Sequence, residues 1–179
     1  MKVLVAYASK AGSTKEIAEF IGEKLRARGV PAEVAEAASL GDVRSFDAFV
    51  MGSAVYNFHW LKEAKEFVER NRATLSSHPV WLFSSGPTGP KATVKEGRDL
   101  KEVWDLKEIN ERIHPRGHRI FLGAFFPDRV KGTAGWFGKW IPKEEQGDFR
   151  NWNDIEAWAN SIAGALLTAE SSLTVDHPN

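Results

Sequence analysis

A stretch of small and polar residues, S9-K-A-G-S-T14, stands between an apolar run and an amphipathic segment. The hydroxyls of Ser9, Ser13 and Thr14 surround Gly12 where a helix is expected to begin. Glycine permits a left-handed backbone, and the first N–H groups of a helix lack partners within it. Such donors are typical of a nest for an anion. A simple helix cap is the alternative, but it would explain one hydroxyl rather than three. We therefore predict that this stretch binds a phosphate.

The spacing of this stretch differs from those of other phosphate-binding loops. The nucleotide P-loop needs two glycines and a Lys-Ser/Thr pair, and the dinucleotide fingerprint needs three glycines. Only one glycine is present here.

A second candidate segment, A54-V-Y-N-F-H-W60, is aromatic. If it is extended, Tyr56, Phe58 and Trp60 lie on one side, because side chains alternate along a strand. Flat side chains beside a phosphate suit a planar heterocycle held by stacking. We expect Tyr56 to contact that ligand. For Trp60, packing against the following helix is the alternative.

A third segment, S84-S-G-P-T-G89, combines hydroxyls with two glycines. It offers hydroxyl and N–H groups to the polar edge of a ring. An ordinary turn between a strand and a loop is the alternative reading.

These three segments can form one site only if the fold brings them together. Apolar runs predict strands, and apolar positions at helical spacing predict helices. Strand then helix recurs five times, although only 37–44 is left for the second helix. This order predicts a doubly wound α/β fold with a five-stranded parallel sheet and helices on both faces. Ligands bind beyond the carboxyl ends of such strands, where the three segments would meet. The expected strands are 2–8, 32–36, 48–53, 79–85 and 118–125, and the expected helices are 14–28, 60–74, 99–113 and 152–168.

The length of 179 residues favours a single domain. We assign residues 1–168 to it and residues 169–179 to a polar C-terminal tail. The N-terminal apolar run is too short for a signal peptide or a membrane span, which favours a cytoplasmic protein.

Composition excludes several kinds of chemistry. Lysine plus arginine and aspartate plus glutamate number 24 each, so the net charge gives no reason to expect nucleic acid. Without cysteine there are no disulfides, iron–sulfur clusters or thiolate zinc sites, and redox chemistry needs a bound cofactor. His114 and His118 are four residues apart, but Pro115 and Gly117 oppose a helical metal pair, so no metal site is predicted.

At this point the chain resembles the flavodoxin-fold FMN proteins. YASKAGSTKEIA is similar to their phosphate loop, and FDAFVMGSAVY to their third strand with the loop beside the flavin. HRIFLGAF, WFGKW at 136–140 and the acidic-aromatic opening of the last helix resemble the flavodoxin-like, menaquinone-dependent protoporphyrinogen dehydrogenases. In that family a threonine usually stands where this chain has Ala11.

The resemblance implies noncovalent FMN and an oxidoreductase or electron-transfer role. A redox partner protein, a quinone or a porphyrinogen-like substrate would exchange electrons with it. A flavin-free interaction module that keeps the fold is the alternative. No catalytic residue is assigned, although Tyr56 and His59 are candidates for proton transfer. The residues expected to bind FMN are Ser9, Lys10, Ala11, Gly12, Ser13, Thr14, Ala54, Val55, Tyr56, Asn57, Ser84, Ser85, Gly86, Thr88 and Gly89.

Family members that carry single electrons often flip a peptide at a glycine beside the flavin. Residues 54–60 contain no glycine. A positive φ costs other residues about 1 kcal/mol or more, and Asn57 would tolerate it best. We therefore expect two-electron chemistry to be favoured.

The segment WFGKWIP could contact a quinone, a porphyrin-like substrate or a membrane surface, because tryptophan favours such interfaces. The alternative, which we favour, is a connector that covers the sheet edge or rims the flavin site. The segment is too short for a membrane helix of its own.

Overall fold

A parallel sheet runs through the centre of the computed structural model, which describes residues 1–86, 88, 103–127 and 142–175. The strand β4 (His59–Trp60) pairs antiparallel with the end of β3. The expected doubly wound fold with five parallel strands is confirmed. In spatial order the parallel strands are β2 (Ala32–Glu36), β1 (Val3–Ala8), β3 (Ala48–Tyr56), β5 (Val80–Ser85) and β6 (Gly117–Phe121).

The interior strand β1 is apolar on both faces because helices cover both sides of the sheet. All its side chains except that of Tyr7 are buried. Leu4 and Ala6 belong to one core, and Val3 and Val5 to the other. Such a continuous apolar run is typical of a parallel strand between two helical layers.

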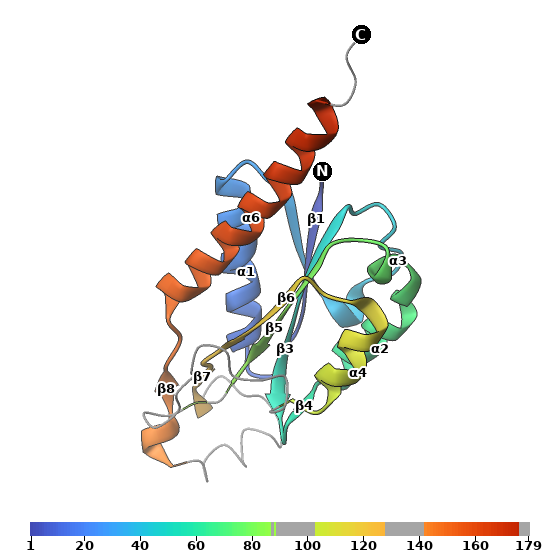
Figure 1. The fold of residues 1–179 in the computed structure, drawn as a ribbon. Helices are drawn as coiled ribbons and strands as arrows, with labels where there is room; N and C mark the ends of the chain where they lie inside the picture. The colour runs from blue at the N-terminus through green and yellow to red at the C-terminus, as the bar shows by residue number, and fades with distance from the viewer. Residues whose placement is uncertain (87, 89–102, 128–141, 176–179) are drawn as a thin grey trace.

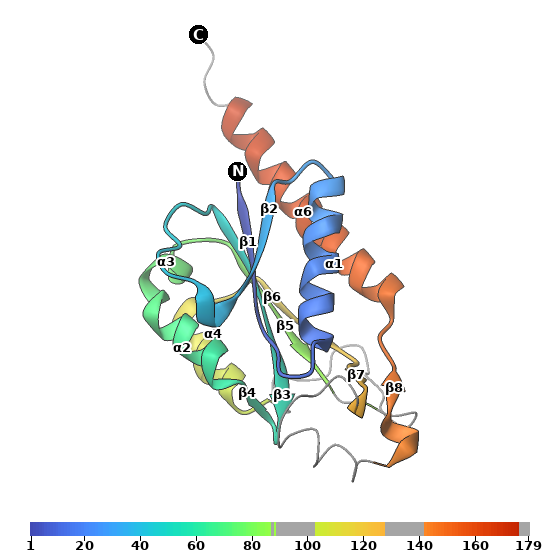
Figure 2. The ribbon, with the colours of Figure 1, turned by 180° about the vertical axis from the view of Figure 1, so that it is seen from behind.

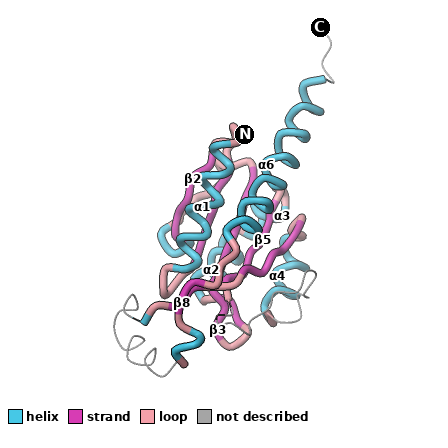
Figure 3. The backbone as a smooth tube through the Cα atoms, turned by 90° about the vertical axis from the view of Figure 1, so that its left-hand side faces the viewer, coloured by secondary structure: helices cyan, strands magenta, loops and turns pink. Residues whose placement is uncertain are grey.

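Two helical layers enclose the sheet (Figures 1 and 2). The helices α1 (Ser13–Ala27) and α6 (Trp152–Val175) pack side by side on one face (Figure 3). On the other face lie α2 (Lys62–Arg70), α3 (Arg72–Ser76) and α4 (Asp105–Ile113).

Each layer contributes an apolar stripe to its core. Ile17, Ile21 and Leu25 of α1 pack in the same cluster as Ile155 and Ile162 of α6. Apolar residues at this spacing form one face of a helix, which is the face that α1 buries.

Two expected helices differ from the structure. After β2 only a short 3-10 helix, η1 (Ala37–Ser39), forms, because the chain returns at once to β3. The helix expected over 60–74 is divided at Asn71, whose side-chain amide donates to the carbonyl of Phe67. Local side-chain bonds of this kind compete with helix continuation.

The strand expected over 118–125 also divides. Its last part, β7 (Ala124–Phe125), leaves the main sheet and pairs antiparallel with β8 (Gly147–Asp148), which follows the 3-10 helix η4 (Lys143–Glu145). This small ribbon brings the segment before α6 close to the N-terminus of α1.

The last helix is longer than expected. α6 continues to Val175, past the expected end at residue 168 and into the expected tail. Residues 176–179 lie outside the described residues, and so does WFGKW at 136–140. In the part of the chain that the structure describes, no helix is long and apolar enough to span a bilayer.

Candidate functional site

One cleft lies at the carboxyl edge of the parallel sheet, where the loops after β1, β3, β5 and β6 meet. The first three loops are the segments expected to bind the ligand. Gly123, Ala124 and Phe125, from the fourth, had been assigned to a strand. The expected residues that line the cleft are Ser9, Ala11, Ser13, Thr14, Ala54, Val55, Tyr56, Ser85, Gly86 and Thr88.

Four expected residues lie near the cleft without lining it. Lys10 is exposed and its ammonium lies 5.3 Å from the ring centre of Tyr56. Gly12 precedes α1, and Asn57 lies in the turn after β3. Ser84 faces away from the cleft, because side chains alternate along β5 and its neighbour Ser85 faces inward. Gly89 lies outside the described residues.

The loop before α1 has the backbone of an anion nest. Gly12 has φ +89°, and its N–H donates to the Ser9 hydroxyl at 3.1 Å. No side chain caps α1. The Ser13 hydroxyl accepts from the N–H of Ala124 at 2.9 Å, which joins this loop to β7. The simple-cap alternative is therefore wrong, and among the described residues no side chain caps the first N–H groups of the helix.

Thr14 provides the strongest sign that a ligand belongs here. Its side chain lines the cleft, the residue is only 1% exposed, and its hydroxyl has no partner among the described residues. An unpaired buried polar group costs about 1–3 kcal/mol. A phosphate in the nest would accept a hydrogen bond from this hydroxyl, so the residues present fit an anionic group.

The aromatic segment is a tight hairpin between β3 and β4. Its two turn residues, Asn57 and Phe58, have φ +49° and +66°. Left-handed turn residues match the twist of a two-residue hairpin. The expectation that Asn57 tolerates a positive φ is confirmed, but a bulky Phe there is unusual. Strained residues of this kind cluster at functional sites.

The turn separates the three aromatic side chains, so the expectation that they share one side is wrong. Tyr56 and Phe58 are exposed, whereas Trp60 is buried. The indole N–H of Trp60 donates to the Ser84 hydroxyl at 2.8 Å, and that hydroxyl lies 2.9 Å from Nε2 of His118. Burial lowers the pKa of His118 to about 4, so its ring is neutral and accepts from Ser84. This relay fixes the hairpin to β5 and β6.

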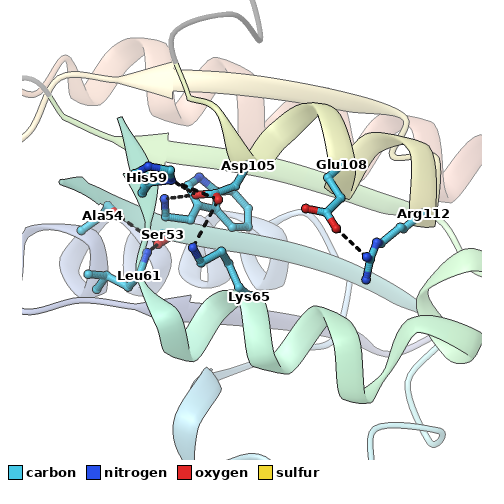
Figure 4. A network of polar contacts seen from close by, with 9 residues as sticks. Ser53, Ala54, His59, Leu61, Lys65, Asp105, Glu108 and Arg112 are labelled. Carbon is cyan, nitrogen blue, oxygen red and sulfur yellow. Dashed lines mark hydrogen bonds and ion pairs between the residues drawn. The ribbon is translucent and has the colours of Figure 1, made fainter. Parts of the chain in front are cut away.

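A carboxylate, Asp105 at the start of α4, holds the other side of the hairpin (Figure 4). It accepts from Nδ1 of His59, from the N–H of Trp60 at 2.8 Å and from Lys65 at 3.2 Å. Partial burial opposes its charge, but these hydrogen bonds keep the pKa of Asp105 below its ordinary value. Nothing in the sequence pointed to this pair, because Asp105 and His59 are 46 residues apart.

Arg150, just before α6, packs against the first turn of α1, beside the loop expected to bind phosphate. Its side chain is only 4% exposed and pairs with Glu16 and Asp148, both at 2.7 Å. It also lies 3.4 Å from the carbonyl oxygen of Ser13 and 4.4 Å from the ring centre of Trp152. Burial opposes its charge, but the two carboxylates raise the pKa of Arg150 further. Sequence reasoning missed this residue, because Glu16 and Ser13, which it contacts, come from the other end of the chain.

Within the described residues, no three His, Cys, Asp or Glu side chains come together as a metal site would require. The fold and the cleft define an α/β protein with a phosphate-type nest and an aromatic hairpin at the carboxyl edge of a parallel sheet. Residues 4–132 match the model of the flavodoxin domain family. The chain belongs to that family.

Similar proteins agree with this membership. Protoporphyrinogen IX dehydrogenase [quinone] of Escherichia coli strain K12 is 28% identical over 173 residues, which cover 91% of this chain and 95% of that protein. A flavodoxin from the domain Archaea has a TM-score of 0.60 at 17% identity, over 92% of this chain and 98% of its own. A flavodoxin of Streptococcus pneumoniae TIGR4 has the same TM-score and identity, over 92% and 99%. At these identities the two solved structures show the fold alone.

Proposed function

We propose that this chain is an FMN-dependent oxidoreductase. The observation that carries the proposal is the unpaired hydroxyl of Thr14, buried in the wall of a cleft that begins at a helix N-terminus. A terminal phosphate is the anion that such a nest accommodates. The neighbouring hairpin and the loop after β5 supply the flat and polar surfaces that a flavin ring requires.

The residues of the cleft divide by role. Ser9, Ser13 and Thr14, with the N–H groups that follow Gly12, would hold the phosphate. Val55 and Tyr56 would contact one side of the ring, and Ser85, Gly86 and Thr88 would reach its edge. Ala11 carries no hydroxyl, so the backbone would supply the contact there. When bound, FMN supplies the electron or hydride transfer, and the chain orients the ring and controls access to it.

Lys10, Asn57, Ser84 and Gly89 complete the proposed FMN site without lining the described cleft. Lys10 would add positive charge near the phosphate, and Asn57 would set the turn beside the ring. Ser84 would act through Trp60, because its hydroxyl accepts from the indole N–H and so holds the hairpin against β5.

The electron donor and acceptor belong to the same proposal. The E. coli relative is named for protoporphyrinogen IX and quinone. We propose a quinone or a porphyrinogen-like compound as substrate, with a redox partner protein as the alternative for an electron-transfer role. We place the protein in the cytoplasm, with residues 1–168 as the flavin domain and 169–179 outside the site.

The absorbance spectrum of the purified protein tests the cofactor. We expect a yellow protein with the bands of oxidised flavin, and release of FMN on denaturation. A colourless protein that takes up no added FMN would support the flavin-free interaction module instead. Steady-state assays with quinone or with NAD(P)H then separate an enzyme from an electron shuttle that accepts electrons only from a partner reductase.

A further inference from the structure

The hairpin beside the cleft carries a histidine in a defined tautomer. Nδ1 of His59 lies 3.1 Å from both oxygens of Asp105. Because a carboxylate only accepts, Nδ1 must carry the proton, and Nε2 is the nitrogen left for other chemistry. The side chain of His59 is 43% exposed, so a ligand can reach it. A carboxylate that orients an imidazole in this way is the arrangement that proton-transfer sites use.

The position of His59 connects it to the proposed flavin cleft. Its direct partner across the hairpin is Tyr56, which lines that cleft. Residues directly opposite in an antiparallel pair have Cβ atoms about 5 Å apart. His59 therefore lies beside the mouth of the cleft rather than in the protein interior.

Two exposed aromatic rings, Phe58 and Trp104, lie next to this imidazole, and we call them the aromatic shelf. They are 55% and 63% exposed, and they stack with ring centres 5.7 Å apart and an interplanar angle of 12°. The N–H of Trp104 donates to the carbonyl of Phe58 at 2.9 Å, and the ring centres of Trp104 and His59 are 5.1 Å apart. The shelf thus offers a flat apolar surface with a proton-bearing group at its edge.

The charged groups around His59 contact Nδ1 or Asp105 and leave Nε2 as the reactive nitrogen. Asp105 faces it from α4, and Lys65 of α2 reaches the same carboxylate rather than the imidazole. On the strand side its neighbour is the phenol of Tyr56, over whose ring Lys10 lies. The ion pair with Lys65 favours the ionised form of Asp105.

We propose that His59, oriented by Asp105, transfers a proton to a quinone that stacks on the aromatic shelf beside the flavin. This inference rests on the proposed function. A quinone is flat and apolar, as the shelf requires, and its carbonyl oxygens accept protons on reduction. His59 is the catalytic residue of this step, and Asp105 is a positioning residue that acts through it.

The step balances in electrons and protons. Reduced FMN, held by the residues of the cleft, would supply the quinone with a hydride, which carries two electrons and one proton. His59 enters this step as an imidazolium, with protons on both ring nitrogens. The second quinone oxygen gains the proton that leaves Nε2, so an O–H bond forms, an N–H bond breaks and the Nδ1–H tautomer held by Asp105 remains. His59 regains its proton from solvent. The quinone, one hydride from the cofactor and one proton from His59 would together give the hydroquinone.

Reoxidation of the FMN-loaded, chemically reduced protein tests the proposal, with menadione or ferricyanide as oxidant in a stopped-flow instrument. Ferricyanide takes single electrons and no proton. We expect His59→Ala to slow the menadione reaction by about 100-fold and Asp105→Asn to slow it by roughly 10-fold. The ferricyanide reaction should keep its rate. Added imidazole should restore menadione reduction in His59→Ala, which a merely structural role would not permit.

A second measurement is independent of activity. Long-range ¹H–¹⁵N spectra should show His59 of the wild type as the Nδ1–H tautomer, and Asp105→Asn should lose that preference. His114→Asn is the matched control, since it replaces an exposed histidine at the far end of α4, in a left-handed position that asparagine tolerates. It should behave as the wild type in both measurements.

The outcomes separate the two proposals. A protein that takes up no FMN overturns the proposed function and this inference with it. A protein that retains FMN, but in which His59→Ala reduces menadione at the wild-type rate, overturns the inference alone. Equal slowing of menadione and ferricyanide would also overturn it, because the defect would then lie in electron transfer.

Discussion

The buried, unpaired hydroxyl of Thr14 would link the stability of the protein to binding of the proposed FMN. Thr14→Val keeps the shape and removes the unpaired group, so the flavin-free protein should gain about 1 kcal/mol in unfolding free energy. FMN affinity should fall roughly 10-fold or more, because a hydrogen bond to a charged phosphate is lost. Urea unfolding and quenching of flavin fluorescence measure the two effects. Riboflavin, which lacks the phosphate, should bind both proteins equally.

The conservative variant Thr14→Ser is the control for this prediction. It retains the hydroxyl and should retain the affinity for FMN. If Thr14→Val bound FMN as tightly as the wild type, the hydroxyl would have no role in the phosphate site.

At the residue scale, the sequence predicted the parts of the site that are local. Ser9, Gly12 and Thr14 form a nest within six consecutive residues, so their spacing was sufficient. Asp105 and Arg150 could not be found in this way, because only the folded chain brings their partners to them. Gly123 was missed because the apolar run 118–125 hid the break after β6.

At the scale of elements, Arg150 controls the charge beside α1. Arg150→Gln leaves Glu16 and Asp148 without their shared cation, so it should weaken FMN binding by about 1 kcal/mol, roughly five-fold. Riboflavin binding should change less, since riboflavin carries no charged phosphate. Fluorescence titrations with both flavins at low salt provide the measurement.

Glu16→Gln is the companion variant of opposite sign. It removes a negative charge from the first turn of α1 and should leave FMN affinity equal or higher. Equal losses for FMN and riboflavin in Arg150→Gln would show that the residue acts through the fold and not through charge.

The contact between β3 and β5 depends on a glycine, because Gly52 leaves room for the ring of Phe83. Gly52 pairs with Phe83, and a Cβ on Gly52 would lie 1.9 Å from the phenyl ring. Gly52→Ala should therefore cost about 3 kcal/mol of unfolding free energy through overpacking, as urea unfolding would measure. Gly164→Ala is the matched control, because a Cβ there meets open space in α6. It should stabilise the protein by about 0.5–1 kcal/mol. A Gly52→Ala protein as stable as the wild type would contradict this packing.

The sequence predicted elements where one physical rule dominates. The apolar run of β1 and the helical spacing of α1 each follow from burial alone. The break at Asn71 goes with a side-chain bond to Phe67. The departure of β7 goes with its pairing to β8 and a bond to Ser13, and no periodicity contains these contacts.

At the scale of the whole molecule, His118 makes stability depend on pH. Its pKa is about 4 in the folded protein and 6.5 in an unfolded chain, so the unfolded chain takes up the proton first. The contribution of neutral His118 to the unfolding free energy is fully present above pH 6.5 and is lost as the pH falls towards 4. Between pH 7 and pH 5 the protein should lose about 2 kcal/mol from this group. His118→Gln should not show this loss of unfolding free energy between pH 7 and pH 5. Urea unfolding at both pH values measures it. An equal loss in both proteins would exclude His118 as the cause.

Two hydrogen bonds join Ser13 to distant parts of the chain. The bond from Ala124 spans 111 residues, and the bond from Arg150 spans 137 residues. During synthesis the phosphate loop leaves the ribosome early, but its partners follow only after most of the chain has been made. At about 5–20 residues per second, the 137 residues between them take roughly 7–27 s to add, so Arg150 follows Ser13 by that time. The loop before α1 can therefore take up its final contacts only when most of the chain has been made, and a chain truncated before β7 would lack the bond between Ala124 and Ser13.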